Sequence, residues 1–243
     1  MACSITTIVL FFKICSFRKL LKDLSLINNA TLFPHGILDY TPSSAKKSNK
    51  TFIVASYGFF LPHKGLLELI EAIDILKKDN ISIKLKMVNA QYPIPESEKL
   101  IKEAKKLINS LNLQNNIILQ TNFLSDNESL KELEEADLII YPYQNTGESA
   151  SGAVRYGIAT GKIVAVSPIP IFDDVQQAVL KLPGTTPKQI AQGIKDIINE
   201  IKNNTNSIQT HKQNAKKWRD AHLYSTLSDR LSNILYSLNL YKQ

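Results

Sequence analysis

Two cationic side chains occur where helices are predicted to begin. Lys64 follows the strand predicted at 51–59, and Arg155 falls in the first turn of the helix predicted after the loop that follows Tyr143. A helix N-terminus already carries roughly half a positive charge, so a cation there is unfavourable unless an anion binds beside it. Both positions lie at the carboxyl ends of predicted parallel strands and would converge on one cleft. This arrangement predicts a diphosphate site.

Each of these residues also has an ordinary structural interpretation. Lys64 would be an exposed surface lysine, and Arg155 would form a salt bridge to an acid such as Asp173 or Asp174. Glu148 lies in the loop before Arg155, and a carboxylate is a poor neighbour for a phosphate because both are negative. We therefore expect Glu148 to accept hydrogen bonds from sugar hydroxyls, the alternative being a capping or turn acid.

The Gly/Ser/Ala-rich loop before Arg155 favours a close approach of an anion to the backbone. We expect Ser151 to be the N-cap of the helix, which places Gly152, Ala153 and Val154 in its first turn. The N–H groups of a first turn have no intrahelical partner and would point into the cleft. The small side chains of this loop would leave room for the anion.

Strand and helix patterns alternate from about residue 51 to residue 200. Apolar runs such as "IIY" and "IVAV" are typical of strands buried on both faces, and stretches such as "HKGLLELIEAIDILKK" have one apolar helical face. The alternation predicts an α/β fold, a doubly wound, Rossmann-like parallel sheet covered by helices on both faces. Thr186 is predicted to cap the last of these helices, with Pro187 at its first position.

Composition and charge exclude several classes of function. The net charge is +7, but the lysines are spread along the chain, so we expect solvated helix faces and no nucleic-acid partner. The two cysteines form no disulfide framework and the four histidines are dispersed, which predicts a cytoplasmic protein without a bound metal. No GxGxxG follows the first strand, which argues against a dehydrogenase.

The apolar run at 5–12 is too short to span a bilayer, which needs about 20 residues. We interpret it as a buried strand or an interfacial segment. The second interpretation would place the protein at the inner face of the membrane as a peripheral contact.

Two motifs together resemble a known family. The stretches "GFFLPHKG" and "ADLIIYPYQNTGESASGAVRYGIATGKIVAVSP", with the strand–helix order between them, are similar to the C-terminal, donor-binding half of family 4 glycosyltransferases with GT-B architecture. The resemblance covers about 31–200. It implies a donor half followed by C-terminal helices, with most of the N-terminal domain missing. It divides the chain into four expected segments: an N-terminal remnant with the interdomain segment at 1–40, a loop or hinge at 41–50, the Rossmann-like domain at 51–205, and C-terminal helices at 206–243.

The resemblance also implies roles for individual residues. Lys64 resembles the lysine that binds the donor diphosphate, and Glu148 resembles the first acid of the family's Glu-x7-Glu motif, which holds the hydroxyls of the donor sugar. We assign Glu148 as the catalytic residue. The assignments by ligand group are Lys64, Arg155, Gly58, Gly152 and Ala153 for the diphosphate, Glu148, Ser149 and Ser151 for the sugar, and Tyr156, Asn89 and Phe123 for the nucleotide.

The chain departs from the family pattern at two positions. Tyr156 stands where the second acid of the motif would fall, an acid that usually contacts the nucleotide ribose. Phe59 and Phe60 occupy the region of the family's phosphate-binding arginine. We expect Arg155 to substitute for that arginine from the other loop, and Tyr156 either to contact the ribose through its hydroxyl or to pack.

The function implied is a glycosyltransferase, or its donor-binding domain. It would transfer a sugar from a nucleotide-diphosphate sugar to a saccharide or lipid-linked acceptor, with retention at the anomeric carbon and with no cofactor or metal. One alternative is a truncated, non-catalytic nucleotide-sugar-binding module or a subunit that needs a separate N-terminal half. The other is a structural α/β domain that binds such a partner.

Overall fold

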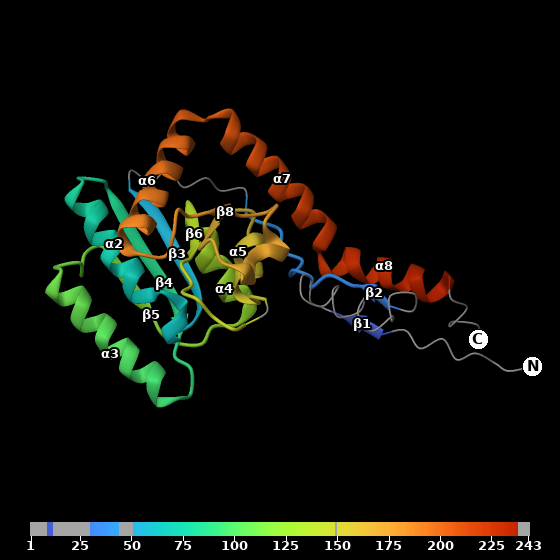
Figure 1. Ribbon diagram of the computed structural model, residues 1–243, viewed down its shortest axis with the longest axis horizontal. Helices are drawn as coiled ribbons and strands as arrows, with labels where there is room; N and C mark the ends of the chain where they lie inside the picture. Colours follow the sequence, from blue (N-terminus) through green and yellow to red (C-terminus); the bar gives the residue numbers. More distant parts are fainter. Residues whose placement is uncertain (1–8, 12–29, 44–50, 149, 238–243) are drawn as a thin grey trace, which may run out of the picture.

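A six-stranded parallel sheet with helices on both faces forms the body of the computed structural model, which describes residues 9–11, 30–43, 51–148 and 150–237 (Figure 1). The strand order is β5-β4-β3-β6-β7-β8, and β1 and β2 pair separately in parallel. The predicted doubly wound, Rossmann-like α/β fold is confirmed. The strands are β1 (Val9–Phe11), β2 (Ala30–Leu32), β3 (Phe52–Phe59), β4 (Ile83–Ala90), β5 (Ile117–Gln120), β6 (Leu138–Tyr141), β7 (Ile163–Val166) and β8 (Leu180–Lys181).

Helices connect successive strands of the sheet. The α-helices are α2 (Leu66–Lys78), α3 (Pro95–Ser110), α4 (Asp126–Glu134), α5 (Ala153–Ala159), α6 (Pro187–Asn203), α7 (Asn206–His222) and α8 (Tyr224–Ser237). Two 3-10 helices, η2 (Pro62–Lys64) and η3 (Pro170–Val175), lie in the connections.

Alternate residues of the central strands enter two separate cores. In β6, Leu138 and Ile140 join the core built with α2, α3 and α6, whereas Ile139 and Tyr141 join the core built with α4, α5 and η3. Successive strand residues point to opposite faces, so a strand buried on both faces must be apolar throughout. Each fully buried aliphatic side chain contributes about 1.5–3 kcal/mol, and these two cores hold the sheet between its helices.

The chain reverses its direction of winding at β3. It proceeds from β3 outward to β4 and β5, and then returns to place β6 on the other side of β3. The connections that leave β3 and β6 therefore diverge to opposite faces of the sheet. In such folds, a crevice opens at the carboxyl ends of the two strands at this switch point.

The C-terminal helices carry the chain away from the sheet. Thr186 caps α6 with a reciprocal capping box to Gln189, and Pro187 is its first residue, as predicted. Figure 1 shows α7 leading from α6 to α8, beyond the edge of the sheet. Ile37 forms a β-bridge with Leu223 at the joint of α7 and α8. The N-terminal segment that precedes the sheet therefore packs against this joint.

Much of the two predicted N-terminal segments lies outside the described residues. Of the expected loop or hinge at 41–50, only 41–43 are described, and of the first 40 residues only 9–11 and 30–40 are described. The proposed domain boundaries therefore stay predictions. The apolar run at 5–12 falls largely outside the described part as well.

Candidate functional site

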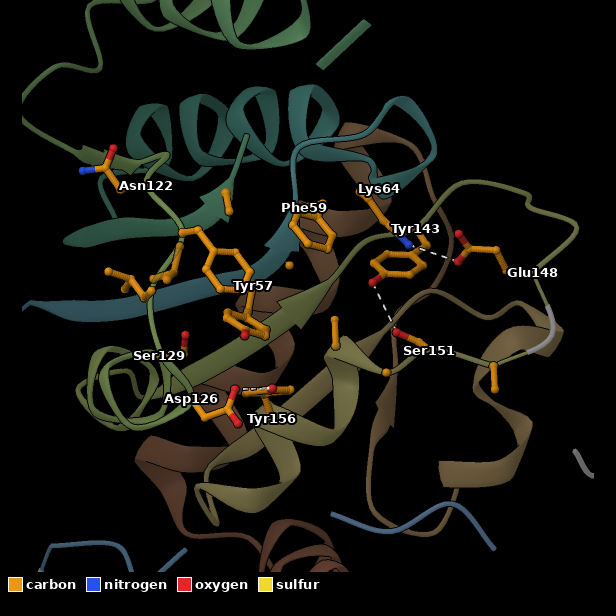
Figure 2. A pocket seen from close by; sticks show the side chains of 18 residues that line it. Tyr57, Phe59, Lys64, Asn122, Asp126, Ser129, Tyr143, Glu148, Ser151 and Tyr156 are labelled. Carbon is orange, nitrogen blue, oxygen red and sulfur yellow. Dashed lines mark hydrogen bonds and ion pairs between the residues drawn. The ribbon is translucent and has the colours of Figure 1, made fainter. Parts of the chain in front are cut away.

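A pocket of about 500 Å³ opens at the switch point between β3 and β6 (Figure 2). Its lining comes from the ends of β3 and β4, from η2, from the loop after β5, from α4, from the loop between β6 and α5, and from α5 itself. The volume falls within the range of small-molecule sites, about 300–1,000 Å³. The site lies where the sheet topology predicts a ligand.

Two loops that are far apart in the sequence are joined at one end of this pocket. The backbone N–H of Gln144 donates to the carbonyl of His63 at 2.9 Å, and the side chain of Gln144 donates to the carbonyl of Thr185 at 3.1 Å. Gly65 has a φ of +66°, and a Cβ at this position would overlap the carbonyl oxygen of Pro142. Only glycine permits this conformation and this approach of the two backbones.

Lys64 lies in the wall at the joined end of the pocket. Its Nζ is 3.1 Å from Oε2 of Glu148 and 4.0 Å from the centre of the Tyr143 ring, and its side chain is only 12% exposed. Burial lowers the pKa of Lys64, and the hydrogen bond to Glu148 opposes this shift. Lys64 is the last residue of η2, before α2 begins, so the prediction that it opens the helix is wrong by two residues. The alternative of a freely exposed lysine is also wrong.

Glu148 has a second contact with η2, through His63. Nε2 of His63 lies 3.1 Å from Oε1 of Glu148, so both carboxylate oxygens face groups that follow β3. Burial and the nearby Lys64 ammonium lower the pKa of His63, while Glu148 opposes the shift. The Glu148 side chain is 43% exposed and can exchange this contact with a ligand.

The small residues predicted to bind a diphosphate meet between the two strands. Gly58 has a φ of +127°, and a Cβ there would lie 3.3 Å from the Cβ of Ala153. Gly58, Gly152, Ala153 and Ser151 all line the pocket. The helix α5 begins at Ala153 with Gly152 as its N-cap, one residue later than predicted, although the Ser151 hydroxyl does accept from Val154 N–H at 3.4 Å.

Aromatic rings and one carboxylate line the opposite end. The Tyr57 and Tyr156 rings are 4.7 Å apart, and the Tyr156 hydroxyl donates to Oδ1 of Asp126 at 2.6 Å (Figure 2). Burial, followed by this hydrogen bond, raises the pKa of Tyr156. Phe59 stacks on Phe123, which is 76% exposed, with ring centres 6.2 Å apart.

Arg155 does not share the cleft with Lys64, and that expectation is wrong. Its side chain is 5% exposed and forms an ion pair with Asp174, which is 9% exposed. It also donates to the carbonyl of Ser151 at 2.7 Å and to that of His35 at 3.5 Å. The structure contains instead the predicted alternative, a salt bridge from Arg155 to an acid of η3, which is Asp174. The guanidinium is held by three partners in the protein interior, and Arg155 does not line the pocket.

Asn89 also departs from its predicted position. It is 1% exposed, and its side-chain oxygen accepts from the Ser56 hydroxyl at 2.6 Å. Its neighbours Val88 and Ala90 line the pocket, whereas Asn89 does not, because successive side chains of a strand alternate in direction. Ser149 lies outside the described residues.

Several pocket residues were not predicted from the sequence, and Asp126, Ser129 and Tyr143 are among them. Asp126 and Ser129 enter from α4, and Tyr143 enters from the loop that follows β6. One available signal was that Asp126 follows the carboxyl end of β5, the edge at which the other candidates were placed. In the described part of the chain, no group of three His, Cys, Asp or Glu side chains is placed to hold a metal ion. No described helix has both the length and the apolar character needed to cross a bilayer.

All four histidines have a lowered pKa, with burial as the largest cause in each. The unfolded chain therefore binds more protons than the folded chain just below the ordinary histidine pKa of 6.5, so stability must fall as the pH falls through this region. We expect urea unfolding at pH 7.0 to give a higher free energy of unfolding than at pH 5.5. An equal or higher value at pH 5.5 would contradict the neutral burial of these rings.

The fold, a parallel sheet flanked by helices, is shared with glycosyltransferases of GT-B architecture. A family model described as "Glycosyl transferases group 1" matches residues 41–218. The match covers most of the 243 residues, and this chain belongs to that family. A search of curated proteins found none that matches.

Solved structures with this fold share little sequence with the chain. A glycosyltransferase from Rickettsia africae ESF-5 is 17% identical with a TM-score of 0.71, and the alignment covers 97% of this chain and 71% of that one. Anabaena HepE, solved in complex with UDP, is 16% identical with a TM-score of 0.73, and the alignment covers 95% of this chain and 64% of HepE. A sucrose-phosphate synthase from Thermosynechococcus elongatus is 15% identical with a TM-score of 0.71, and the alignment covers 97% of this chain and 59% of the synthase. The chain thus spans about 60–70% of the length of these proteins.

Proposed function

We propose that the pocket binds a nucleotide-diphosphate sugar, and that the chain is the donor-binding part of a glycosyltransferase acting on a saccharide or lipid-linked acceptor. The observation that carries this proposal is Lys64, a largely buried ammonium at the end of the pocket, held by the exposed carboxylate of Glu148 over the Tyr143 ring. Such an ammonium is costly to bury and gains from a more highly charged anion. A diphosphate is an anion of this kind.

The donor would exchange one ion pair for another. Diphosphate oxygens take the place of Glu148 at Nζ of Lys64, and repulsion turns the Glu148 carboxylate toward the sugar, whose hydroxyls donate to it. The first N–H groups of α5, at Gly152 and Ala153, line the same pocket and stabilise the charge that develops as the diphosphate leaves. No metal is required, because Lys64 and these N–H groups supply the positive charge.

The nucleotide would lie toward the aromatic end of the pocket. Phe59, Tyr92 and Phe123 form a group of rings with centres 4.9 Å and 6.2 Å from Phe59. An exposed ring at the mouth of a pocket offers a face for stacking by a nucleobase. HepE, which shares this fold, was solved with UDP, and this supports a nucleoside diphosphate as the ligand.

Replacement of Lys64 tests this proposal directly. We expect Lys64→Ala to weaken binding of UDP, GDP or ADP, whichever binds best, by about 10- to 100-fold in isothermal titration calorimetry, because a charge-assisted contact is lost. Lys86→Ala is the matched control. Its side chain is 13% exposed and also pairs with acids, Glu132 and Glu135, but it does not line the pocket. The proposal is wrong if no nucleoside diphosphate binds the parent protein, or if the two variants lose affinity equally.

A second candidate is a nucleotide-sugar-binding module or subunit that needs a separate N-terminal half for turnover. Donor hydrolysis and transfer assays on the chain alone, beside the titrations, separate the two candidates. Binding without release of sugar favours the module, and release favours the enzyme. We place either form in the cytoplasm, where a peripheral contact with the inner face of the membrane would give access to lipid-linked acceptors.

A further inference from the structure

The pocket has charged groups at both ends, and the proposed function assigns a role only to those at the Lys64 end. Lys64 and Glu148 lie at one end, and Asp126 lies at the other end with the Tyr156 and Tyr57 rings (Figure 2). Asp126 is exposed to solvent and reaches the pocket from the first residue of α4. A carboxylate that is distant from the cation of the same pocket can contact a different part of the same ligand.

The carboxylate of Asp126 is not part of the cap of α4. Ser125 caps α4, and Glu128 completes the capping box by accepting from Ser125 N–H at 2.9 Å, so the helix start is satisfied without Asp126. Among the described residues, no Lys, Arg or His forms an ion pair with it. Its hydrogen bond from Tyr156 occupies Oδ1, and a carboxylate has about four acceptor positions. Acceptor capacity therefore remains for a ligand.

Tyr156 determines where this carboxylate points. Its ring is held against Tyr57 with centres 4.7 Å apart, and its hydroxyl donates to Asp126 at 2.6 Å. The tyrosine comes from α5, one turn after Ala153, so the pair lies along the pocket wall that begins at the proposed diphosphate position. A fixed ring with its hydroxyl on the carboxylate orients the acceptor oxygens.

A nucleoside diphosphate has a complementary arrangement of groups. Its phosphates are at one end, and its ribose carries two neighbouring hydroxyls, 2′ and 3′, whose hydrogens a carboxylate accepts. We propose that Asp126, positioned by Tyr156, binds the ribose hydroxyls and makes the pocket selective for ribonucleoside over deoxyribonucleoside diphosphates. This inference rests on the proposed function, because it takes the Lys64 end as the diphosphate position.

Paired nucleotides isolate the contribution of these hydroxyls. Titration calorimetry would compare UDP with 2′-deoxy-UDP and 3′-deoxy-UDP on the parent chain and on Asp126→Asn, Asp126→Ala and Tyr156→Phe, with the GDP and ADP pairs in parallel. We expect the parent to favour the ribonucleotide by roughly tenfold over at least one deoxy analogue, the loss of one hydrogen bond to a charged acceptor. Asp126→Ala removes this preference. Asp126→Asn and Tyr156→Phe reduce it.

A control variant and a second measurement distinguish failure of this inference from failure of the proposed function and from loss of the fold. Glu96→Gln removes a first-turn acid from α3, outside the pocket, and should leave the ribose preference unchanged. Thermal unfolding of each variant shows that it is folded. If nucleoside diphosphates bind in a Lys64-dependent way but without a ribose preference, or if Asp126→Ala keeps the preference, the inference is overturned and the proposed function stands. If no nucleoside diphosphate binds the parent chain, both the inference and the proposed function are wrong.

Discussion

Arg155→Ala is expected to lower the free energy of unfolding by about 3–5 kcal/mol, the usual cost of removing one member of a buried ion pair. The Arg155 and Asp174 side chains are 5% and 9% exposed, so the carboxylate left behind could not be rehydrated without a change in the surrounding structure. Oδ1 of Asp174 is already buried without a hydrogen-bond partner among the described residues. The pair also joins α5 to η3 and, through the His35 carbonyl, to the segment that precedes the sheet.

Urea unfolding of two further variants tests this explanation. The double variant Arg155→Met/Asp174→Leu should regain most of the lost stability, because it leaves no unpaired buried charge. Lys102→Ala breaks an exposed pair with Glu98 and should cost at most about 0.5 kcal/mol. A cost of that small size for Arg155→Ala would show that the guanidinium is not buried in solution.

Nucleotide binding by Arg155→Ala distinguishes a structural role of Arg155 from the ligand-binding role that was expected of it. Since Arg155 contacts the carbonyl of Ser151, a pocket residue, a modest loss of nucleotide affinity is expected. This loss should be much smaller than that of Lys64→Ala. An equal loss in a folded Arg155→Ala protein would return Arg155 to the donor site.

Gly65→Ala is expected to cost about 2–5 kcal/mol, the sum of a left-handed conformation at a non-glycine residue and an overpacked contact. Gly65 has a φ of +66°, and its new Cβ would overlap the Pro142 carbonyl, a backbone group that cannot rotate away. The loops that hold Lys64 and Glu148 must then separate. Nucleotide affinity should therefore fall together with stability.

One glycine of the same region provides a matched control. A Cβ at Gly147 meets nothing within 4 Å, and Gly147 does not have a positive φ. Gly147→Ala is expected to change the free energy of unfolding by no more than about 0.5 kcal/mol. If Gly65→Ala were as mild as this control in both unfolding and titration experiments, the close approach of the two loops would not be needed for the site.

Local electrostatics predicted correctly that Arg155 needs an anion, but it could not identify the anion. A cation in the first turn of a helix requires a negative partner, and this follows from neighbouring residues alone. Whether that partner is a ligand or the carboxylate of Asp174 depends on where η3 packs, 19 residues further along the chain. The sequence pattern is the same in both cases.

The sequence alone determined the fold class and the edge of the sheet that carries the site. Apolar runs alternating with amphipathic stretches require strands buried on both faces, and Lys64 and the loop at 144–152 were placed at the carboxyl ends of such strands because local patterns define where strands end. Tertiary structure decided which side chains share the cavity. Arg155 and Asn89 lie outside the pocket, whereas Asp126 and Tyr143 line it. The reason is that strand order, packing and side-chain direction arise from contacts between residues distant in the sequence.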